Sequence, residues 1–447
     1  MNNRDVFQGA EQAWVVSVNM GYGHQRTAFP LRDLTFRQEI LNANDYQGIS
    51  NRDKKIWSGI RSSYEAISNF YRVPFLGKPI FNLFDKFQEI ISFYPKKDLS
   101  RPSFQLKQTA RIIRSGLGKD LIEKLKKENE KLGRDLPFVA TFFTPAFMAE
   151  EFNYPGPIFC VVCDADVSRA WAPLFPKNSK IRYFAPTERV VERLKLYGVN
   201  PNNIIFSGYP LPLENIGENS SILKEDLKYR IFNLDPKRKY FTKYRNLIED
   251  NLDGLPDNPS HPLTIMFSIG GAGAQKEIGL NILQNLAGKI ASRQIKIILS
   301  VGIRKKVKKY FEREINHKFS SLASNDYLEI LYKENIFEYF KEFNKKLRET
   351  DVLWTKPSEL SFYSALGVPI IISPTIGSQE EFNKRWLLKS GFGLAQENPK
   401  HTDQWLFDWL DEGYLAEAAM EGFVEGERRG VLKITESLIS NEEYIKK

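Results

Sequence analysis

Short apolar runs rich in β-branched and aromatic residues recur along the chain, and segments with helical spacing of apolar residues separate most of them. The pattern predicts strands at 13–18, 138–143, 158–162, 181–185 and 204–207, then at 263–268, 295–301, 327–331, 352–354 and 369–373. It predicts helices at 187–197, 275–293 and 303–318. Strands that alternate with helices are typical of parallel sheets built from βαβ units. In such sheets, ligands bind beyond the carboxyl ends of the strands.

The two series of strands indicate two domains, as does the length of 447 residues, which exceeds what one ordinary core accommodates. A stretch dense in proline, glycine and asparagine separates the series and favours a linker. We therefore predict an α/β protein with an N-terminal Rossmann-like domain at 1–213, a linker at 214–260, a C-terminal Rossmann-like domain at 261–405 and a helical segment at 406–447.

Residues 50–135 break the alternation, since no clear strand pattern occurs there, and we predict a helical insertion in the first domain. Ten aromatic residues stand between 57 and 94, and the stretch 96–135 carries 12 Lys/Arg against 6 Asp/Glu. Two interpretations remain open. The aromatic residues pack on the first sheet, or they form a surface for a lipid or other apolar acceptor, beside cations that face an anionic membrane.

Composition excludes several classes of function. No apolar run approaches the ~18 residues of a membrane span, and the N-terminus lacks the pattern of a signal peptide, so we expect a cytoplasmic protein, at most peripheral on the inner face of the membrane. The net charge is +9, but no nucleic-acid-binding module is recognisable, and we expect no nucleic-acid partner. Cys160 and Cys163 lie in a predicted buried strand without a second pair, which favours core residues over a zinc or redox site.

Two predicted strands end in glycine-rich turns. The first runs into Gly21, Gly23 and His24, a turn that either cradles a phosphate, holds a catalytic base or is simply tight. The second opens the C-terminal domain with Gly270, Gly271, Ala272 and Gly273, just before a predicted helix. Exposed N–H groups and the dipole at a helix start suit a diphosphate. Neither the P-loop nor the dinucleotide-binding spacing is present in this second turn.

Polar residues follow the next two strands of the same domain and are expected to meet at one edge of its sheet. Lys356 is a candidate to pair with phosphate, Glu359 to bind a ribose hydroxyl pair, and Gln379 and Glu380 to bind sugar hydroxyls. A surface or capping role is the alternative for each residue alone. Together they fit a nucleotide sugar.

The order of these motifs resembles that of inverting GT-B glycosyltransferases, the group with diacylglycerol glycosyltransferases, monogalactosyldiacylglycerol synthases and the peptidoglycan GlcNAc transferase. The resemblance covers most of the chain outside the insertion and linker. It rests on the following segments of this sequence: 21–24, 161–164, Trp171, 185–188, 207–212, 270–273, 356–359 and 376–383. It implies two Rossmann-like domains with parallel sheets that face a central cleft. It also implies that the last helix crosses back to the first domain.

The resemblance implies roles for particular residues. His24 is the base that takes a proton from the acceptor, and the turn at Gly21 and Gly23 lies on the acceptor side. Asp164 is expected to orient either the acceptor or His24. Donor contacts are implied for the glycine loop and for a second set of residues. That set comprises Lys356, Ser358, Glu359, Gln379, Glu380 and Asn383.

The sequence departs from the family pattern in three places, one of which is that Ser364 or Phe362 stands where the family usually has a glutamate for the donor ribose, so that Glu359 is expected to replace it. Pro212 stands where the family often has an arginine near the donor phosphates, and Ser358 and Glu359 replace two glycines. Asp164 and Asp166 also spell D-x-D, a metal-nucleotide signature of another glycosyltransferase fold, but the donor loop lies in the other domain, and we predict no metal.

These features together predict a metal-independent, inverting glycosyltransferase with no cofactor. Its predicted partners are a UDP-linked nucleotide sugar and a lipid or saccharide acceptor. Two alternatives stay open. One is a sugar-nucleotide 2-epimerase of the same fold, against which the aromatic and basic insertion argues. The other is a non-catalytic binding protein, which the changes at Pro212 and Ser358 favour.

Overall fold

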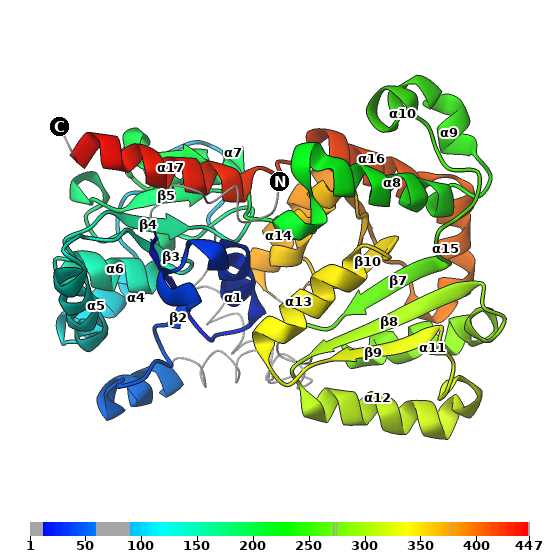
Figure 1. Ribbon diagram of the computed structural model, residues 1–447, viewed down its shortest axis with the longest axis horizontal. Coiled ribbons are helices and arrows are strands. Elements are labelled where there is room, and N and C mark those ends of the chain that lie inside the picture. Colours follow the sequence, from blue (N-terminus) through cyan, green and yellow to red (C-terminus); the bar gives the residue numbers. More distant parts are fainter. Residues whose placement is uncertain (1–11, 60–89, 271–272, 274, 376, 446–447) are drawn as a thin grey trace. The chain divides into compact units, whose positions relative to one another are not determined.

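The computed structural model describes residues 12–59, 90–270, 273, 275–375 and 377–445 (Figure 1). The chain divides into two compact units. Unit 1 comprises Met1–Leu211, Ile376–Asn383 and Glu427–Lys447, and unit 2 comprises Pro212–Thr375 and Lys384–Gly426. Each unit contains one six-stranded sheet in which every pair of neighbouring strands is parallel. This confirms the prediction of two Rossmann-like α/β domains.

The sheet of unit 1 has the strand order β2-β1-β3-β4-β5-β6. Its strands are β1 (Trp14–Ser17), β2 (Leu41–Asn42), β3 (Phe138–Ala140), β4 (Ile158–Val161), β5 (Arg182–Ala185) and β6 (Ile204–Phe206). The order reverses between β1 and β3, which makes this pair the topological switch point. In open α/β sheets, ligands bind outside the carboxyl ends of the strands at such a point.

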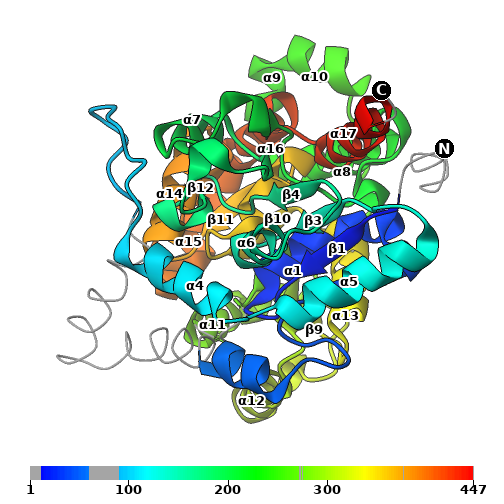
Figure 2. The same ribbon diagram turned by 90° about the vertical axis from the view of Figure 1, so that its left-hand side faces the viewer.

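The described helices of unit 1 include α1 (Tyr22–Ala28), α4 (Phe104–Arg114), α5 (Lys119–Leu132), α6 (Phe143–Glu151), α7 (Glu188–Leu196) and α17 (Gly430–Ile445), and residues 51–59 are helical as well. Helices α4 and α5 form part of the predicted insertion and pack against α6, in front of the sheet in Figure 2. Trp57 and Phe93 of the insertion are buried, whereas Tyr94 is exposed. Aromatic residues of the described part of the insertion thus occur both in the core and at the surface, and a surface for a lipid or other apolar acceptor stays a prediction. The others lie outside the described residues: Tyr64, Phe70, Tyr71, Phe75, Phe81, Phe84 and Phe87.

The sheet of unit 2 has the order β12-β11-β10-β7-β8-β9. Its strands are β7 (Leu263–Ser268), β8 (Ile295–Gly302), β9 (Leu328–Tyr332), β10 (Val352–Thr355), β11 (Ile370–Ile372) and β12 (Gly393–Ala395). Counted along the chain, this is the 3-2-1-4-5-6 order of dinucleotide-binding folds, and its switch point lies between β7 and β10. The glycine loop follows β7, so the strand order brings it next to the loop that follows β10.

Nine helices among the described residues belong wholly or partly to unit 2. They are α8 (Ser221–Leu234), α9 (Lys239–Lys243), α10 (Arg245–Leu252), α11 (Lys276–Ala291), α12 (Lys305–Lys318), α13 (Ile336–Leu347), α14 (Ser378–Lys389), α15 (Thr402–Asp411) and α16 (Tyr414–Glu425). Figure 1 shows α12 beside β9. The stretch predicted as a linker contains α8, α9 and α10. Helix α14 begins in unit 1 and ends in unit 2.

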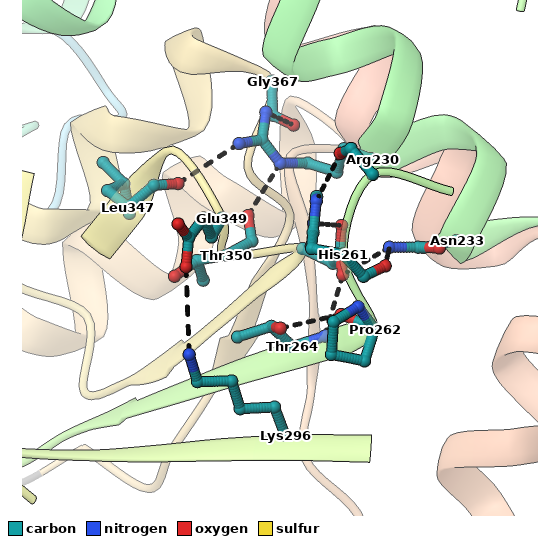
Figure 3. A network of polar contacts seen from close by, with 12 residues as sticks. Arg230, Asn233, His261, Pro262, Thr264, Lys296, Leu347, Glu349, Thr350 and Gly367 are labelled. Carbon is teal, nitrogen blue, oxygen red and sulfur yellow. Dashed lines mark hydrogen bonds and ion pairs between the residues drawn. The ribbon is translucent and has the colours of Figure 1, made fainter. Parts of the chain in front are cut away.

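A buried polar network holds α8 against the amino-terminal edge of the unit 2 sheet (Figure 3). The Arg230 guanidinium donates to four backbone carbonyls, including those of Thr350 at 2.9 Å and Leu366 at 3.1 Å. The Asp351 carboxylate accepts from Asn233 at 3.0 Å and from the N–H of Thr264 at 2.8 Å. A buried guanidinium needs such partners. The network therefore serves the packing of unit 2, at the edge opposite to the glycine loop.

All ten predicted strands occur, with shifts of a few residues at their ends. The sequence pattern missed two short edge strands, β2 and β12. Only two or three residues long, they present too few apolar positions to show a period. Among the described residues, none of the helices combines the length and apolar character that a membrane span requires.

Candidate functional site

His24 lies at the switch point of unit 1. Strand β1 ends at Ser17, and α1 begins at Tyr22 after Gly21, which has φ 104° and ψ 177°. This φ is rarely adopted by residues with a side chain, so glycine permits the sharp entry into the helix. His24 occupies the first turn of α1. The turn therefore positions a titratable ring at the carboxyl end of β1.

The His24 ring is fixed by the loop that follows β3. Its Nδ1 lies 3.0 Å from the carbonyl oxygen of Thr141, and the Thr141 hydroxyl donates to the carbonyl of His24 at 2.9 Å. A carbonyl only accepts hydrogen bonds, so Nδ1 carries the proton and Nε2 carries the lone pair. Among the described residues, Nε2 has no hydrogen-bond partner. These contacts bridge β1 and β3 and leave one tautomer of the ring.

Apolar neighbours keep this ring neutral. Its centroid lies 4.5 Å from that of Phe142 and 6.4 Å from that of Trp171, and the Cys163 sulfur lies 3.4 Å from Nδ1. Desolvation lowers the pKa of His24 from 6.5 to about 4, although the hydrogen bond to Thr141 opposes this shift. At neutral pH, the imidazole is therefore almost entirely in its basic form.

The loop after β4 is clamped from two sides within unit 1. The Asn383 side chain accepts from the N–H of Ala165 at 2.8 Å and donates to the Asp164 carboxylate at 3.2 Å. The Thr187 hydroxyl donates to the carbonyl of Ala165 at 2.9 Å and caps α7 by accepting from the N–H of Val190. Asp164 Oδ2 also lies 3.8 Å from the Cys163 sulfur. The clamp holds this carboxylate beside the residue that contacts His24.

The second acid of the D-x-D sequence serves the core. Asp166 and Arg193 form a two-pronged ion pair with both N···O distances at 2.8 Å, and both side chains are almost completely buried. Asp166 also accepts from the N–H of Val167. No cluster of three or more His, Cys, Asp or Glu side chains suited to a metal ion occurs in the part of the chain that the structure describes.

In unit 2, the structure brings the glycine loop and Lys356 together. A Cβ added at Gly270 would lie 2.5 Å from Lys356 Cε, so the lysine stem runs directly over this glycine. The N–H of Gly273 donates to the carbonyl of Gly270 at 2.8 Å, and Gly273 has φ +67°. Three further loop residues, Gly271, Ala272 and Ala274, lie outside the described residues. The contact joins the loops on either side of the β7–β10 switch point.

A second hydrogen bond ties the glycine loop to the loop after β11. The Gln275 side chain donates to the carbonyl of Pro374 at 2.6 Å, and Gln275 directly precedes α11. Ser358 and the buried Glu359 begin the 3₁₀ helix η10 (Glu359–Leu366), which follows the Lys356 loop. Unit 2 thus contains five of the described donor candidates: Gly270, Gly273, Lys356, Ser358 and Glu359. The other three, Gln379, Glu380 and Asn383, belong to unit 1.

Sequence reasoning missed Thr141 and the proximity of Cys163 to His24. Thr141 lies inside the strand predicted at 138–143 and directly follows the observed β3, whereas Cys163 directly follows the strand predicted at 158–162; β3 and β4 end at the same sheet edge as β1. The rule that ligands bind beyond the carboxyl ends of the strands could therefore have indicated that Thr141 and Cys163 lie near His24. Cys160 and Cys163 are buried and free, as predicted for core residues, but Cys163 also lies against the candidate base.

The family described as "Domain of unknown function (DUF6938)" matches residues 256–330. No curated protein matches the sequence. The UDP-GlcNAc 2-epimerase from Neisseria meningitidis bound to UDP-GlcNAc is 15% identical, with a TM-score of 0.43 over 77% of this chain and 84% of that chain.

Two further solved structures are similar to this chain. The glycosyltransferase SnogD from Streptomyces nogalater is 11% identical, with a TM-score of 0.43 over 96% of this chain and 99% of that chain. MurG from Acinetobacter baumannii is 13% identical, with a TM-score of 0.43 over 71% of this chain and 77% of that chain. Glycosyltransferases and an epimerase thus both stand among the proteins to which this chain is similar.

Proposed function

We propose that the chain is an inverting, metal-independent glycosyltransferase. It moves a hexosyl group from a nucleotide sugar, with UDP as the nucleotide, to a hydroxyl of a lipid-linked or otherwise apolar acceptor. The observation that carries the proposal is the state of His24. Its Nδ1–H is committed to Thr141, and its ring is neutral at pH 7. The fixed tautomer leaves the lone pair of Nε2 available to accept a proton from a hydroxyl nucleophile, while the lowered pKa makes this imidazole a weaker base than a free one.

In the proposed reaction, the acceptor hydroxyl oxygen attacks the anomeric carbon of the donor sugar. The new C–O bond forms as the bond from that carbon to the β-phosphate oxygen breaks, and its electron pair leaves with UDP. The hydroxyl proton moves to Nε2 of His24. Attack opposite to the leaving group inverts the configuration. General-base help of this kind contributes ~10²- to 10⁴-fold in rate.

Unit 2 supplies groups for the donor diphosphate. The N–H groups of the glycine loop and the start of α11 stabilise negative charge, and the ammonium of Lys356, whose stem crosses Gly270, adds a cation. Such preorganised groups favour the transition state, since charge builds up on the leaving diphosphate as the bond breaks. The contact between Lys356 and Gly270 supports this assignment.

The other candidate residues bind the ribose and the sugar of the donor or position the acceptor side of the site. Ser358 and Glu359 contact the ribose, and Gln379 and Glu380 contact hydroxyls of the sugar. Asn383 is a positioning residue, because both ends of its side chain are occupied in clamping the loop after β4. That clamp positions Asp164 as the acid that orients the acceptor on the side of Gly21 and Gly23.

An exposed aromatic surface in unit 1 supports an apolar acceptor at an anionic membrane. Tyr94, Phe104 and Phe175 are 67%, 66% and 65% exposed, the highest values among the large hydrophobic side chains described. Arg169 links two of their segments, since its guanidinium donates to the carbonyl of Ser100 and to those of residues 172 and 173. The Arg189 guanidinium lies 5.9 Å from the centroid of the Tyr94 ring, and aromatic rings beside basic residues suit the interface of an anionic bilayer.

Vesicle co-sedimentation tests the membrane part of the proposal. The protein is expected to bind vesicles that contain anionic lipid more strongly than purely zwitterionic ones. Phe104→Ser with Phe175→Ser is expected to weaken that binding, whereas serine at Tyr414, an exposed aromatic residue of unit 2, leaves it unchanged. Equal binding by all variants would contradict the assignment of this surface.

The donor is tested first, by thermal unfolding in the presence of nucleotides and nucleotide sugars. A UDP sugar and UDP are expected to raise the melting temperature, because a ligand that binds the folded state stabilises it. A mass-spectrometric screen of lipid and saccharide hydroxyl compounds with the stabilising donor then identifies the acceptor. If no nucleotide or nucleotide sugar shifts the melting temperature, the proposed function is wrong.

Variants of His24 test the chemical step. His24→Asn retains an N–H donor near the position of Nδ1 but has no basic nitrogen, so transfer is expected to fall by ~10²- to 10⁴-fold with donor affinity nearly unchanged. Thr141→Val serves as a matched control, because it removes the hydroxyl but keeps the carbonyl that fixes the ring. A large loss of donor affinity in His24→Asn would contradict the assigned role.

The same assays separate the alternatives. Epimerised sugar or free UDP formed from the donor without any acceptor would indicate a sugar-nucleotide 2-epimerase. Donor binding without turnover across the acceptor screen would indicate a non-catalytic binding protein. Transfer to an acceptor that depends on His24 supports the glycosyltransferase.

A further inference from the structure

A second cation flanks the glycine loop of unit 2. Strand β8 pairs with β7 on the side opposite to β10, and the three strands are parallel. Their following loops therefore lie side by side at one edge of the sheet. Arg304 stands in the loop after β8, directly before α12. The strand order thus places the glycine loop between the loop of Lys356 and that of Arg304.

The Arg304 side chain lies close to Gly273 of the glycine loop. A Cβ added at Gly273 would lie 3.8 Å from Arg304 Cδ and 3.1 Å from Val307 Cγ2. At the other end of the turn, Gly270 contacts the stem of Lys356 in the same way. The two contacts fix a cationic side chain at each end of the turn from Gly270 to Gly273.

One nitrogen of the Arg304 guanidinium is buried and unsatisfied among the described residues. Its Nε is buried without a hydrogen bond, and no ion pair of Arg304 exists within the described ranges. This differs from the buried Arg193 and Arg230, whose guanidinium groups are satisfied by a carboxylate or by several carbonyls. A buried, unsatisfied donor costs free energy, which an anionic ligand would offset.

We propose that Arg304 binds the diphosphate of the nucleotide ligand, from the side of the glycine loop opposite to Lys356. The inference rests on the proposed function, since it presumes a nucleoside diphosphate at this loop. A guanidinium forms paired hydrogen bonds with phosphate oxygens, which an ammonium does not. Arg304 thereby supplies, from another loop, a guanidinium that the chain lacks at Pro212, the position where the sequence comparison expected one.

Calorimetry with UDP and with uridine tests this assignment. Arg304→Gln is expected to weaken UDP binding by roughly 10- to 100-fold, the range for a lost charge-assisted contact. Uridine has no phosphate, so its affinity is expected to stay the same. Arg304→Lys retains the charge without the fork and is expected to lose roughly three- to tenfold in UDP affinity. If Arg304→Gln folds poorly, the UDP affinity of Arg304→Lys still tests the assignment.

Lys305→Gln and Lys306→Gln are matched controls, because they remove an exposed positive charge from the next two positions of α12. Each is expected to bind UDP within about twofold of the unmodified protein, since it removes no direct contact. Equal UDP affinity in Arg304→Gln and the unmodified protein would overturn the role of Arg304 alone. Equal losses in the lysine controls and in Arg304→Gln would overturn it as well. Failure of the unmodified protein to bind UDP would overturn the proposed function, and the role of Arg304 with it.

Discussion

The desolvated histidine of unit 1 makes the stability of the protein depend on pH in a defined way. The pKa of His24 falls from 6.5 in the unfolded chain to about 4 in the folded protein. Between these two values, the unfolded state binds more protons than the folded state, so the free energy of unfolding decreases as the pH falls. The contribution is fully present above pH 6.5 and is lost progressively as the pH falls toward 4.

The change in the free energy of unfolding follows from the difference between the two pKa values of His24. One pKa unit corresponds to about 1.4 kcal/mol, so the contribution of His24 above pH 6.5 is about 3 kcal/mol, and all of it is lost below pH 4. At pH 5, the two binding curves give a loss of about 2 kcal/mol relative to pH 7.5. This is a large fraction of the stability of an ordinary domain.

Urea unfolding at pH 7.5 and pH 5 measures the effect. The loss of unfolding free energy between the two values is expected to be about 2 kcal/mol smaller in His24→Gln than in the unmodified protein. Comparing the losses, rather than the absolute stabilities, cancels any packing defect that the substitution causes at both pH values. His317→Gln, at an exposed position of α12, is the matched control and is expected to keep the unmodified pH dependence.

A direct titration completes the test. The chain has four histidines, so histidine-labelled protein gives a simple NMR spectrum in which His24 is assigned by its absence from the variant. Its Nδ1 is expected to remain protonated while Nε2 titrates near pH 4. A His24 pKa near 6.5, or the same pH-dependent loss of stability in His24→Gln and the unmodified protein, would refute the reasoning about desolvation.

Three further substitutions have defined outcomes. Asp166→Asn leaves the charge of Arg193 buried without its counter-ion. It is expected to lower the free energy of unfolding, measured in urea, by about 3–5 kcal/mol. A loss below 1 kcal/mol would contradict the buried ion pair. Thr187→Ala removes a helix cap and is expected to cost about 1 kcal/mol in the same assay, whereas no loss would show that the cap is dispensable. Gly270→Ala displaces the Lys356 stem and is expected to weaken UDP binding in calorimetry roughly tenfold with little change in melting temperature. Unchanged UDP affinity in that variant would separate Lys356 from the diphosphate.

The sequence by itself determined the two α/β units and the turns that carry their candidate residues. Apolar runs of four to eight residues specify buried strands through local burial, which is visible as a one-dimensional pattern. The glycines before His24 and at Gly270 indicate strand-to-helix turns, because glycine is frequent where the backbone turns sharply. This signal is also local in the sequence. The edge strands β2 and β12 were missed because they are too short to show a period.

Only the tertiary structure decided which side chains meet. Thr141 lies 117 positions from His24 along the chain, yet it fixes the tautomer of that ring, because parallel pairing of β1 with β3 brings their ends together. Arg304 comes to lie beside the glycine loop because β8 pairs with β7, and strand order is not a local property of the sequence. Desolvation likewise depends on neighbours from distant segments, so a pattern along the chain predicts that a histidine is present but not its pKa.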